Sequence, residues 1–259
     1  MDHRRNQSDP ERNAGLMYKA AGLEAQEVTE EELRAINKYT LSPLKAEDVF
    51  TFKAVLCDND LDRQYEHFTP KALQEMQKLF LGRTVIKDHI ASADNQVARI
   101  YATEVQDTGK LLKSGEPYMQ LLAHCYMVRT ESNADLVKEI QGGIKKEGSV
   151  GFRPSSCVCS ICGTDNAKNY CRHYAGRSYD KEGGKQVCTF KLDGVKDAYE
   201  FSLVAVPAQR KAGACKSYTG EVVFEDEMQD ATQEKEAEKA KELALRARLS
   251  AARAHIMDN

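Results

Sequence analysis

The sequence lacks any apolar run of the length that a membrane span requires, which is about 18 to 20 residues. Its opening residues, MDHRRNQSDPERNAGL, are too polar for a signal peptide. A strong charge of one sign is also missing, since the formal net charge is -3 in 259 residues. We therefore expect a soluble cytoplasmic protein with no membrane partner and no global electrostatic reason to bind nucleic acid.

The sequence around Ser149 lacks the Gly-x-Ser-x-Gly motif of the α/β-hydrolases. It reads KKEGSVGFRP, in which Gly148 directly precedes the serine and only Gly151 has the spacing of that motif. This difference argues against an α/β-hydrolase. It leaves two interpretations of Ser149, a nucleophile or a small residue in a tight turn.

The chain does have enough apolar residues for one core, because 41% of its residues are hydrophobic and 30% are charged. A polar, aperiodic start predicts a disordered arm over residues 1–28. A folded domain is expected over 29–224. The charged, alanine-rich segment 225–259 predicts a helical tail that forms no tight core of its own.

Strand-like and helix-like patterns alternate within the folded segment. Thr29 and Glu32 predict a capping box, and Thr69 followed by Pro70 predicts the start of a second helix. The predicted strands cover residues 48–57, 83–90, 97–106, 117–128 and 198–208, and a third helix covers 133–141. These patterns predict an α+β fold that is mainly β.

A serine nucleophile needs a base that takes its proton, and histidine is the usual one. Of the six histidines, four lie in the expected tails, in a polar loop or among the cysteines. His89 and His124 remain as candidate bases. Each also fits a structural histidine with satisfied hydrogen bonds.

The order of four short motifs resembles that of a known family. A predicted strand ends in KDHI, VARI follows it, and GSVGF and YEFSLVAVPA come later in the chain. In order and spacing these motifs resemble the prohead (capsid maturation) serine proteases of tailed bacteriophages, which are related to the herpesvirus assembly proteases. The resemblance covers residues 48–214 apart from a cysteine-rich insertion. It implies a closed β-barrel wrapped by helices, unrelated to chymotrypsin.

The resemblance also implies the residues of the site. The family's histidine falls on His89, its nucleophilic serine on Ser149, and the acidic residue that opens its final strand on Glu200. Backbone N–H groups within 148–152 could stabilise an oxyanion, since glycine allows close approach of the backbone.

The third role in this triad has competitors. In the herpesvirus branch a second histidine takes it, and that histidine would be His124. Asp88 and Asp94 are further acidic neighbours of His89 in the sequence. The sequence leaves the choice between these residues and Glu200 open.

The chain departs from the family pattern in an insertion over residues 155–194. Four of its residues follow the spacing C-x2-C-x8-C-x-H: Cys159, Cys162, Cys171 and His173. Three thiolates and one imidazole match a tetrahedral structural zinc site, and Gly163 supplies the turn of a knuckle. Because four protein ligands leave no open position for water, we expect Zn²⁺ to fold the loop without taking part in catalysis. The alternatives are a loop of reactive thiols without a metal, or a site in which Cys157 or Cys188 replaces one ligand.

The function that these observations favour is that of a serine endopeptidase. The resemblance implies cleavage of scaffold or capsid-protein extensions, and of the protein's own tails, inside an assembling procapsid in the cytoplasm of the bacterial host. The implied partners are the major capsid protein or its scaffold segment, and the scaffold protein. The herpesvirus enzymes suggest a homodimer. No nucleic-acid partner is expected.

Two other functions remain open. The insertion alone is compatible with a zinc-knuckle module that binds nucleic acid through Lys168, Arg172 and Arg177. The whole chain is compatible with a catalytically inactive capsid assembly or scaffold protein that keeps the fold without the chemistry. A salt-sensitive interaction with nucleic acid would indicate the first, and a serine that does not react with an active-site probe would indicate the second.

Overall fold

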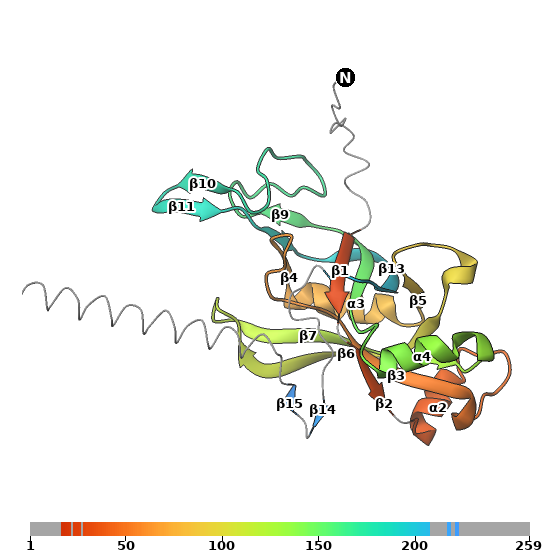
Figure 1. The fold of residues 1–259 in the computed structure, drawn as a ribbon. Coiled ribbons are helices and arrows are strands. Elements are labelled where there is room, and N and C mark those ends of the chain that lie inside the picture. Colours follow the sequence, from red (N-terminus) through yellow and green to blue (C-terminus); the bar gives the residue numbers. More distant parts are fainter. Residues whose placement is uncertain (1–16, 22, 27, 208–216, 219–220, 223–259) are drawn as a thin grey trace, which may run out of the picture. The chain divides into compact units, whose positions relative to one another are not determined.

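The computed structural model describes residues 17–21, 23–26, 28–207, 217–218 and 221–222 (Figure 1). The chain divides into two compact units, residues 1–214 and 215–259. Among its described residues, the second unit contains one short hairpin, β14 (Ser217–Tyr218) with β15 (Glu221–Val222). The first unit is mixed α+β, with many strands and few helices, as the sequence predicts.

The main sheet of the first unit has eight strands in the order β1-β8-β13-β5-β6-β7-β3-β2. Their bounds are β1 (Met17–Ala21), β2 (Leu23–Gln26), β3 (Val49–Asp58), β5 (Thr84–Lys87), β6 (Ala98–Leu111), β7 (Pro117–Val128), β8 (Gly148–Pro154) and β13 (Val195–Leu203). β13 lies between β5, to which it is parallel, and β8, to which it is antiparallel.

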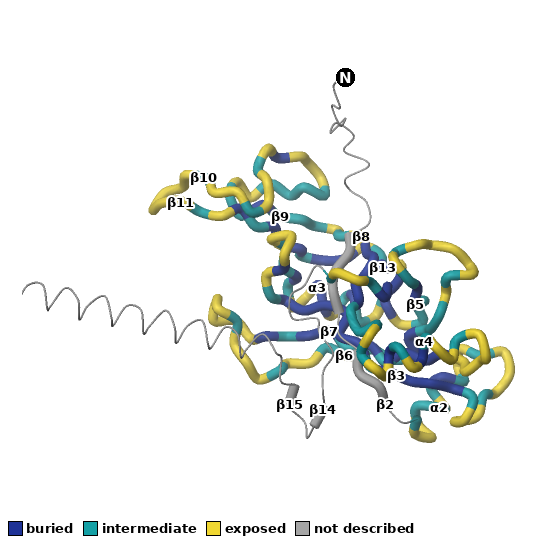
Figure 2. Tube along the Cα trace, in the orientation of Figure 1, coloured by how far each residue is buried: buried dark blue, intermediate teal, exposed yellow. Residues whose placement is uncertain are grey.

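The insertion begins and ends in a smaller sheet. Its strands β9 (Cys157–Cys159) and β12 (Phe190–Leu192) are antiparallel, and β12 is also parallel to β4 (Glu66–Phe68). Between them, β10 (Ser178–Lys181) and β11 (Gly184–Val187) form a separate hairpin. Figure 2 shows the residues of this hairpin as largely exposed.

Two of the expectations about the fold need correction. Residues 17–21 and 23–26 are not a disordered arm, because β1 pairs with β8 and β2 pairs with β3; residues 1–16, 22 and 27 lie outside the described part of the chain. The sequence signal for a strand is weak in MYKAA and LEAQ, because apolar and polar residues do not alternate clearly in either segment. Pairing with strands that are distant in the sequence decides their conformation. Second, no closed barrel is found among the described residues, since the strand order ends at β1 and at β2.

The helices begin where the predicted caps lie. In α2 (Glu30–Ile36) the Thr29 hydroxyl accepts a hydrogen bond from the Glu32 N–H at 3.2 Å, and the Glu32 carboxylate accepts one from the Thr29 N–H at 2.9 Å. The hydroxyl of Thr69 accepts in the same way at the start of α3. The remaining helical segments are α3 (Pro70–Phe80), α4 (Ala134–Gln141), and the 3-10 turns η1 (Ala46–Asp48), η2 (Ala93–Asn95) and η3 (Glu131–Asn133). None of the described helices is long and apolar enough to cross a membrane.

The main core lies between α3 and the sheet. From α3 it receives Ala72, Leu73, Met76 and Phe80, which recur at helical spacing. β7 contributes alternate residues, Leu121 to Met127, as its sequence predicts. Burying one such Leu or Phe side chain contributes about 1.5 to 3 kcal/mol. Cys57 and Cys125 are buried here and are structural thiols.

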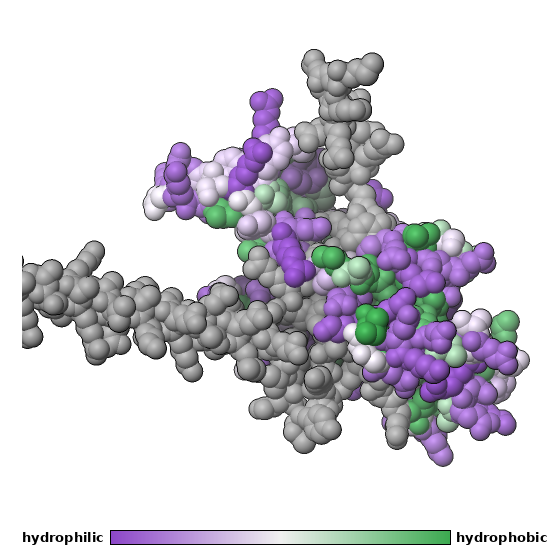
Figure 3. Space-filling model, in the orientation of Figure 1, coloured by the Kyte–Doolittle hydropathy of each residue, from purple (hydrophilic) through white to green (hydrophobic). Residues whose placement is uncertain are grey.

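Charged and polar side chains cover most of the described surface seen in Figure 3, and the apolar ones form small separate patches on that face. A second apolar cluster lies under α2, where Ile36 packs with Val49, Tyr101 and Tyr126. The two clusters occupy opposite faces of β7, since Cys125 belongs to the main core and Tyr126 to this one.

Alternation along β8 and β13 sorts their side chains onto two faces. Val150 on β8 and Phe201 on β13 enter the main core. Ser149 and Ser202, which lie opposite each other in the register, therefore share the other face, together with Glu200. All three are buried, with 3%, 0% and 5% of their surface exposed. The fold thus gathers polar side chains at a place where an apolar residue would be expected.

Candidate active site and metal centre

A histidine and a carboxylate meet at the end of β5. His89 Nδ1 lies 2.9 Å from Glu200 Oε1, and the two side chains are 18% and 7% exposed. With Nδ1 donating to the carboxylate, Nε2 is the ring nitrogen that can accept a proton. The pair therefore has the chemical form of an oriented general base.

The backbone that carries this histidine is strained. Asp88 and His89 have φ values of 52° and 57°, in the left-handed region that non-glycine residues seldom enter. This conformation costs about 1 to 3 kcal/mol per residue and concentrates at functional sites. Two hydrogen bonds from the turn to β13 hold it, Asp88 N–H to Leu203 O at 2.9 Å and His89 N–H to Ser202 Oγ at 2.8 Å.

Ser202 is the residue that the sequence analysis did not single out. The alternation of β13 already placed it on the same face as Glu200, which is the one signal that could have identified it. Its contact is with the backbone of a residue 113 positions earlier. A pattern of neighbouring residues in the sequence cannot predict a contact between such distant positions.

Ser149 lies in a strand, so its interpretation as a tight-turn residue is wrong. It is opposite Ser202 in the register of β8 and β13, and Ser202 accepts the His89 N–H. Among the described residues the Ser149 hydroxyl makes no hydrogen bond with another side chain or with the backbone. The described residues therefore show no hydrogen bond between Ser149 and His89, the contact that a serine–histidine pair would use.

The expected oxyanion donors within 148–152 are not available. Over these residues β8 has β1 on one side and β13 on the other. A strand with two neighbours uses its N–H groups in the two ladders. The sequence analysis missed this because it treated residues 17–21 as disordered.

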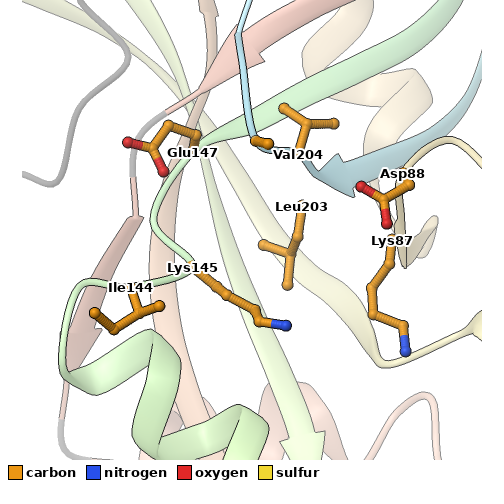
Figure 4. Close-up of a pocket in the computed structure, with 8 residues that line it drawn as sticks. Lys87, Asp88, Ile144, Lys145, Glu147, Leu203 and Val204 are labelled. Atoms are coloured by element: carbon orange, nitrogen blue, oxygen red, sulfur yellow. The ribbon is translucent and has the colours of Figure 1, made fainter.

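A cavity of about 350 Å³ adjoins the site (Figure 4). It is lined by Lys87, Asp88, Ile144, Lys145, Glu147, Leu203, Val204 and Ala205. Asp88 directly precedes His89 and Leu203 directly follows Ser202, while His89, Ser149 and Glu200 are not among the lining residues. Figure 4 shows Leu203 in the middle, with the Lys145 amine and the Asp88 carboxylate reaching toward it from the two sides.

A β-bulge brings Glu200 to this face. Ala198 is part of the core, so unbroken alternation would point Glu200 into the core as well. The register between β13 and β8 shifts between Ala198 and Glu200, and this shift turns the carboxylate toward His89. The second oxygen, Oε2, is buried without a hydrogen-bond partner in the described part of the chain. A buried carboxylate oxygen without a hydrogen-bond partner lowers the free energy of unfolding, and such exceptions are typical of functional sites.

The competing residues for the third role have other neighbours. His124 Nε2 lies 3.5 Å from Glu104 Oε1, and its ring makes an edge contact with Tyr101 at 5.8 Å. Asp94 lies in η2 and Asp88 lines the cavity. Of these candidates, Glu200 is the one whose carboxylate contacts the His89 ring.

The four predicted metal ligands come together in the insertion. The donor atoms of Cys159, Cys162, Cys171 and His173 all lie within 4.8 Å of one another. A zinc ion bound to thiolates at about 2.3 Å holds its ligands about 3.8 Å apart, so the set is close to a bound arrangement. Gly163 supplies the expected turn with a φ of 73°.

The chemistry of the donors also fits a metal ion. Nδ1 of His173 is buried and has no hydrogen-bond partner among the described residues, as a ligand nitrogen would. The hydrogen bond with the Thr164 hydroxyl, at 3.2 Å, lowers the pKa of the Cys162 thiol to about 6, which favours the thiolate that binds metals. The four residues could therefore hold a metal ion, and zinc is consistent with three sulfurs and one nitrogen.

Two other cysteines were considered as substitute ligands. Cys188 Sγ lies 3.8 Å from Cys159 Sγ, but neither Cys188 nor Cys157 belongs to the set of four mutually close donors. Burial raises the pKa of the Cys188 thiol to about 12. The geometry thus favours the original four, with Cys188 packed beside them.

Two of the three basic residues considered for nucleic-acid binding have side-chain neighbours within the insertion. Lys168 Nζ lies 3.4 Å from Asp165 Oδ2, and the Arg177 guanidinium stacks over the Tyr174 ring at 4.7 Å. Arg172 is exposed.

Comparison with known proteins gives no family: no family model matches the chain, and no curated protein or solved structure matches it significantly.

Proposed function

We propose that this protein is a serine endopeptidase with Ser149 as nucleophile, His89 as general base and Glu200 as the residue that orients the histidine. The observation that carries the proposal is the buried contact between His89 and Glu200 on the same face of the sheet as Ser149. A strained histidine turn and an adjoining cavity accompany this contact, and both are features that concentrate at functional sites.

The chemistry follows the usual course of a serine hydrolase. His89 Nε2 takes the proton of the Ser149 hydroxyl as Oγ attacks the carbonyl carbon of a peptide bond. The protonated imidazole, stabilised by Glu200, then gives that proton to the leaving amine. Water hydrolyses the resulting ester with His89 again as base.

The fold of the proposed family is a closed barrel, and one feature supports it here. β1 and β2 are the two end strands of the sheet order, and only residue 22 separates them in the chain. One continuous segment therefore borders both β8 and β3. A strand that serves both ends of a sheet is how a barrel would close.

We infer that the metal centre is structural. All four donors come from the protein, so a bound zinc would have no open position for water. When bound, the ion would supply folding free energy to the insertion. Cys159 and Cys171 would hold it in the interior of the loop, since both are buried.

The substrates that we propose are polypeptides of an assembling phage procapsid, namely capsid-protein extensions or scaffold, and the protein's own tails. The motif order around KDHI, GSVGF and YEFSLV supports this setting. The cavity supports a polypeptide substrate in general terms, because apolar and charged groups line it together.

The test is intact mass spectrometry of the protein after co-expression with the capsid protein encoded alongside it. We expect fragments with the wild type and none with Ser149→Ala or His89→Ala. Ser132→Ala and His124→Ala are matched controls and should leave the fragments unchanged, because both residues have neighbours outside the proposed site. Fragments that persist in Ser149→Ala would rule out the proposal.

The alternatives give different results. An inactive assembly protein would show no labelling of Ser149 by a fluorophosphonate probe, in any variant. A nucleic-acid module would bind a labelled oligonucleotide with an affinity that falls steeply with salt, and Arg172→Ala would weaken it.

A further inference from the structure

One strand, β13, contacts the histidine turn with two side chains. Glu200 Oε1 contacts the ring of His89, and Ser202 Oγ accepts the backbone N–H of the same residue at 2.8 Å. Both contacts come from residues two positions apart on one face of β13. The ring and the backbone of His89 are therefore held by a single rigid element.

The hydroxyl replaces a backbone partner that the sheet cannot provide. The ladder between β5 and β13 runs to Lys87 opposite Leu203, and Asp88 N–H still reaches Leu203 O at 2.9 Å. At His89 the chain turns away with a φ of 57°. The N–H of His89 then points at the side chain of Ser202 and not at a strand carbonyl.

The acceptor of this hydrogen bond is shielded from solvent. Ser202 is 0% exposed, and the turn contains two successive residues in the left-handed region. A strained conformation persists only when its surroundings hold it in place. Removal of the acceptor would take away the hydrogen bond that holds the His89 N–H and would free the turn to relax toward ordinary φ values.

We propose that Ser202 is a positioning residue, which holds the His89 turn so that the imidazole faces Ser149. The inference rests on the proposed endopeptidase function. Ser202 does not exchange a proton with substrate in this scheme; it acts through the backbone of His89. Ser202 lies opposite Ser149 in the register of β13 and β8, so one residue neighbours both the histidine turn and the strand of the nucleophile.

The test uses full-length protein and a fluorophosphonate probe, which reports the activation of Ser149 without a known substrate. For Ser202→Ala we expect the maximal labelling rate to fall by roughly 10- to 100-fold, since small misplacements of catalytic groups have effects of this order. The probe concentration for half-maximal labelling should change by less than about twofold, because the binding surface is intact. Ser202→Thr keeps the hydroxyl and should restore most of the rate.

A second measurement separates positioning from a general loss of packing. Amide hydrogen exchange at His89, followed by NMR, should be at least about tenfold faster in Ser202→Ala, while amides of β7 stay protected. Thr51→Ala, which removes a buried hydroxyl from β3 outside the site, is the control and should change neither readout. If the alanine variant does not fold, Ser202→Cys has nearly the same shape and only a weak acceptor and is used in its place.

The outcomes distinguish this inference from the proposed function. Wild-type labelling in Ser202→Ala, with Ser149→Ala unlabelled, would overturn the role of Ser202 and leave the nucleophile in place. Slow labelling with wild-type protection of the His89 amide would also overturn it. If Ser149→Ala is still labelled, the proposed function fails. The exchange experiment still applies in that case, and an unchanged exchange rate of the His89 amide in Ser202→Ala would reject the hydrogen bond between Ser202 and His89.

Discussion

Replacement of Glu200 by glutamine removes a charge from the site while keeping the shape of the side chain. The Glu200 carboxylate lies 2.9 Å from His89 Nδ1 and is 7% exposed, so solvent screens the contact little. A hydrogen bond to a charged group contributes about 1.5 to 3 kcal/mol. Because about 1.36 kcal/mol corresponds to a factor of ten, the reactivity of Ser149 should fall roughly 10- to 150-fold.

The assay is the rate at which a fluorophosphonate labels Ser149 at neutral pH. Glu104→Gln is a matched control, since Glu104 Oε1 lies 3.5 Å from a different histidine, His124. The control should label at the wild-type rate. The loss in Glu200→Gln should also be smaller than in His89→Ala, because the base itself is still present.

Stability provides the second control. The thermal midpoint of Glu200→Gln should stay within about 2 to 4 °C of the wild type, which corresponds to about 1 kcal/mol in a domain of this size. Unchanged labelling in Glu200→Gln, with Ser149→Ala unlabelled, would refute the orienting role. Slow labelling in Glu104→Gln would transfer that role to His124.

Two further predictions concern the insertion and the tail. Protein purified without chelator should contain about one zinc per chain, and Cys162→Ser should lose it and unfold at a lower temperature, because the site supplies folding free energy to the insertion; wild-type protein without zinc would contradict the assignment. Removal of residues 225–259, which lie outside the described residues and have few large apolar side chains, should spare the labelling of Ser149 while reducing incorporation into particles. A parallel loss of labelling and of stability would show that the tail belongs to the folded domain.

The elements of the fold that depend on neighbouring residues could be predicted from the sequence. Thr29 with Glu32 and Thr69 with Pro70 mark the two helix starts, and the structure has both caps. The alternation of β7 identified its core face. The spacing of four metal-ligand residues identified their cluster, because most of that spacing lies within one short loop. Each of these patterns involves residues that are close in the sequence, so it can be recognised without knowledge of the tertiary structure.

Contacts across long stretches of chain were decided only by the tertiary structure. Glu200 and Ser202 contact His89 from 111 and 113 residues away, and only the folded chain shows that the carboxylate of Glu200 lies beside the His89 ring while His124 lies beside Glu104. The bulge that turns Glu200 out of the core has no signature in YEFSLV, since it arises from the register between two strands. The pairing of residues 17–21 with β8 and of 23–26 with β3 likewise depends on the partner strands, because a strand with weak alternation takes its conformation from the sheet that it joins.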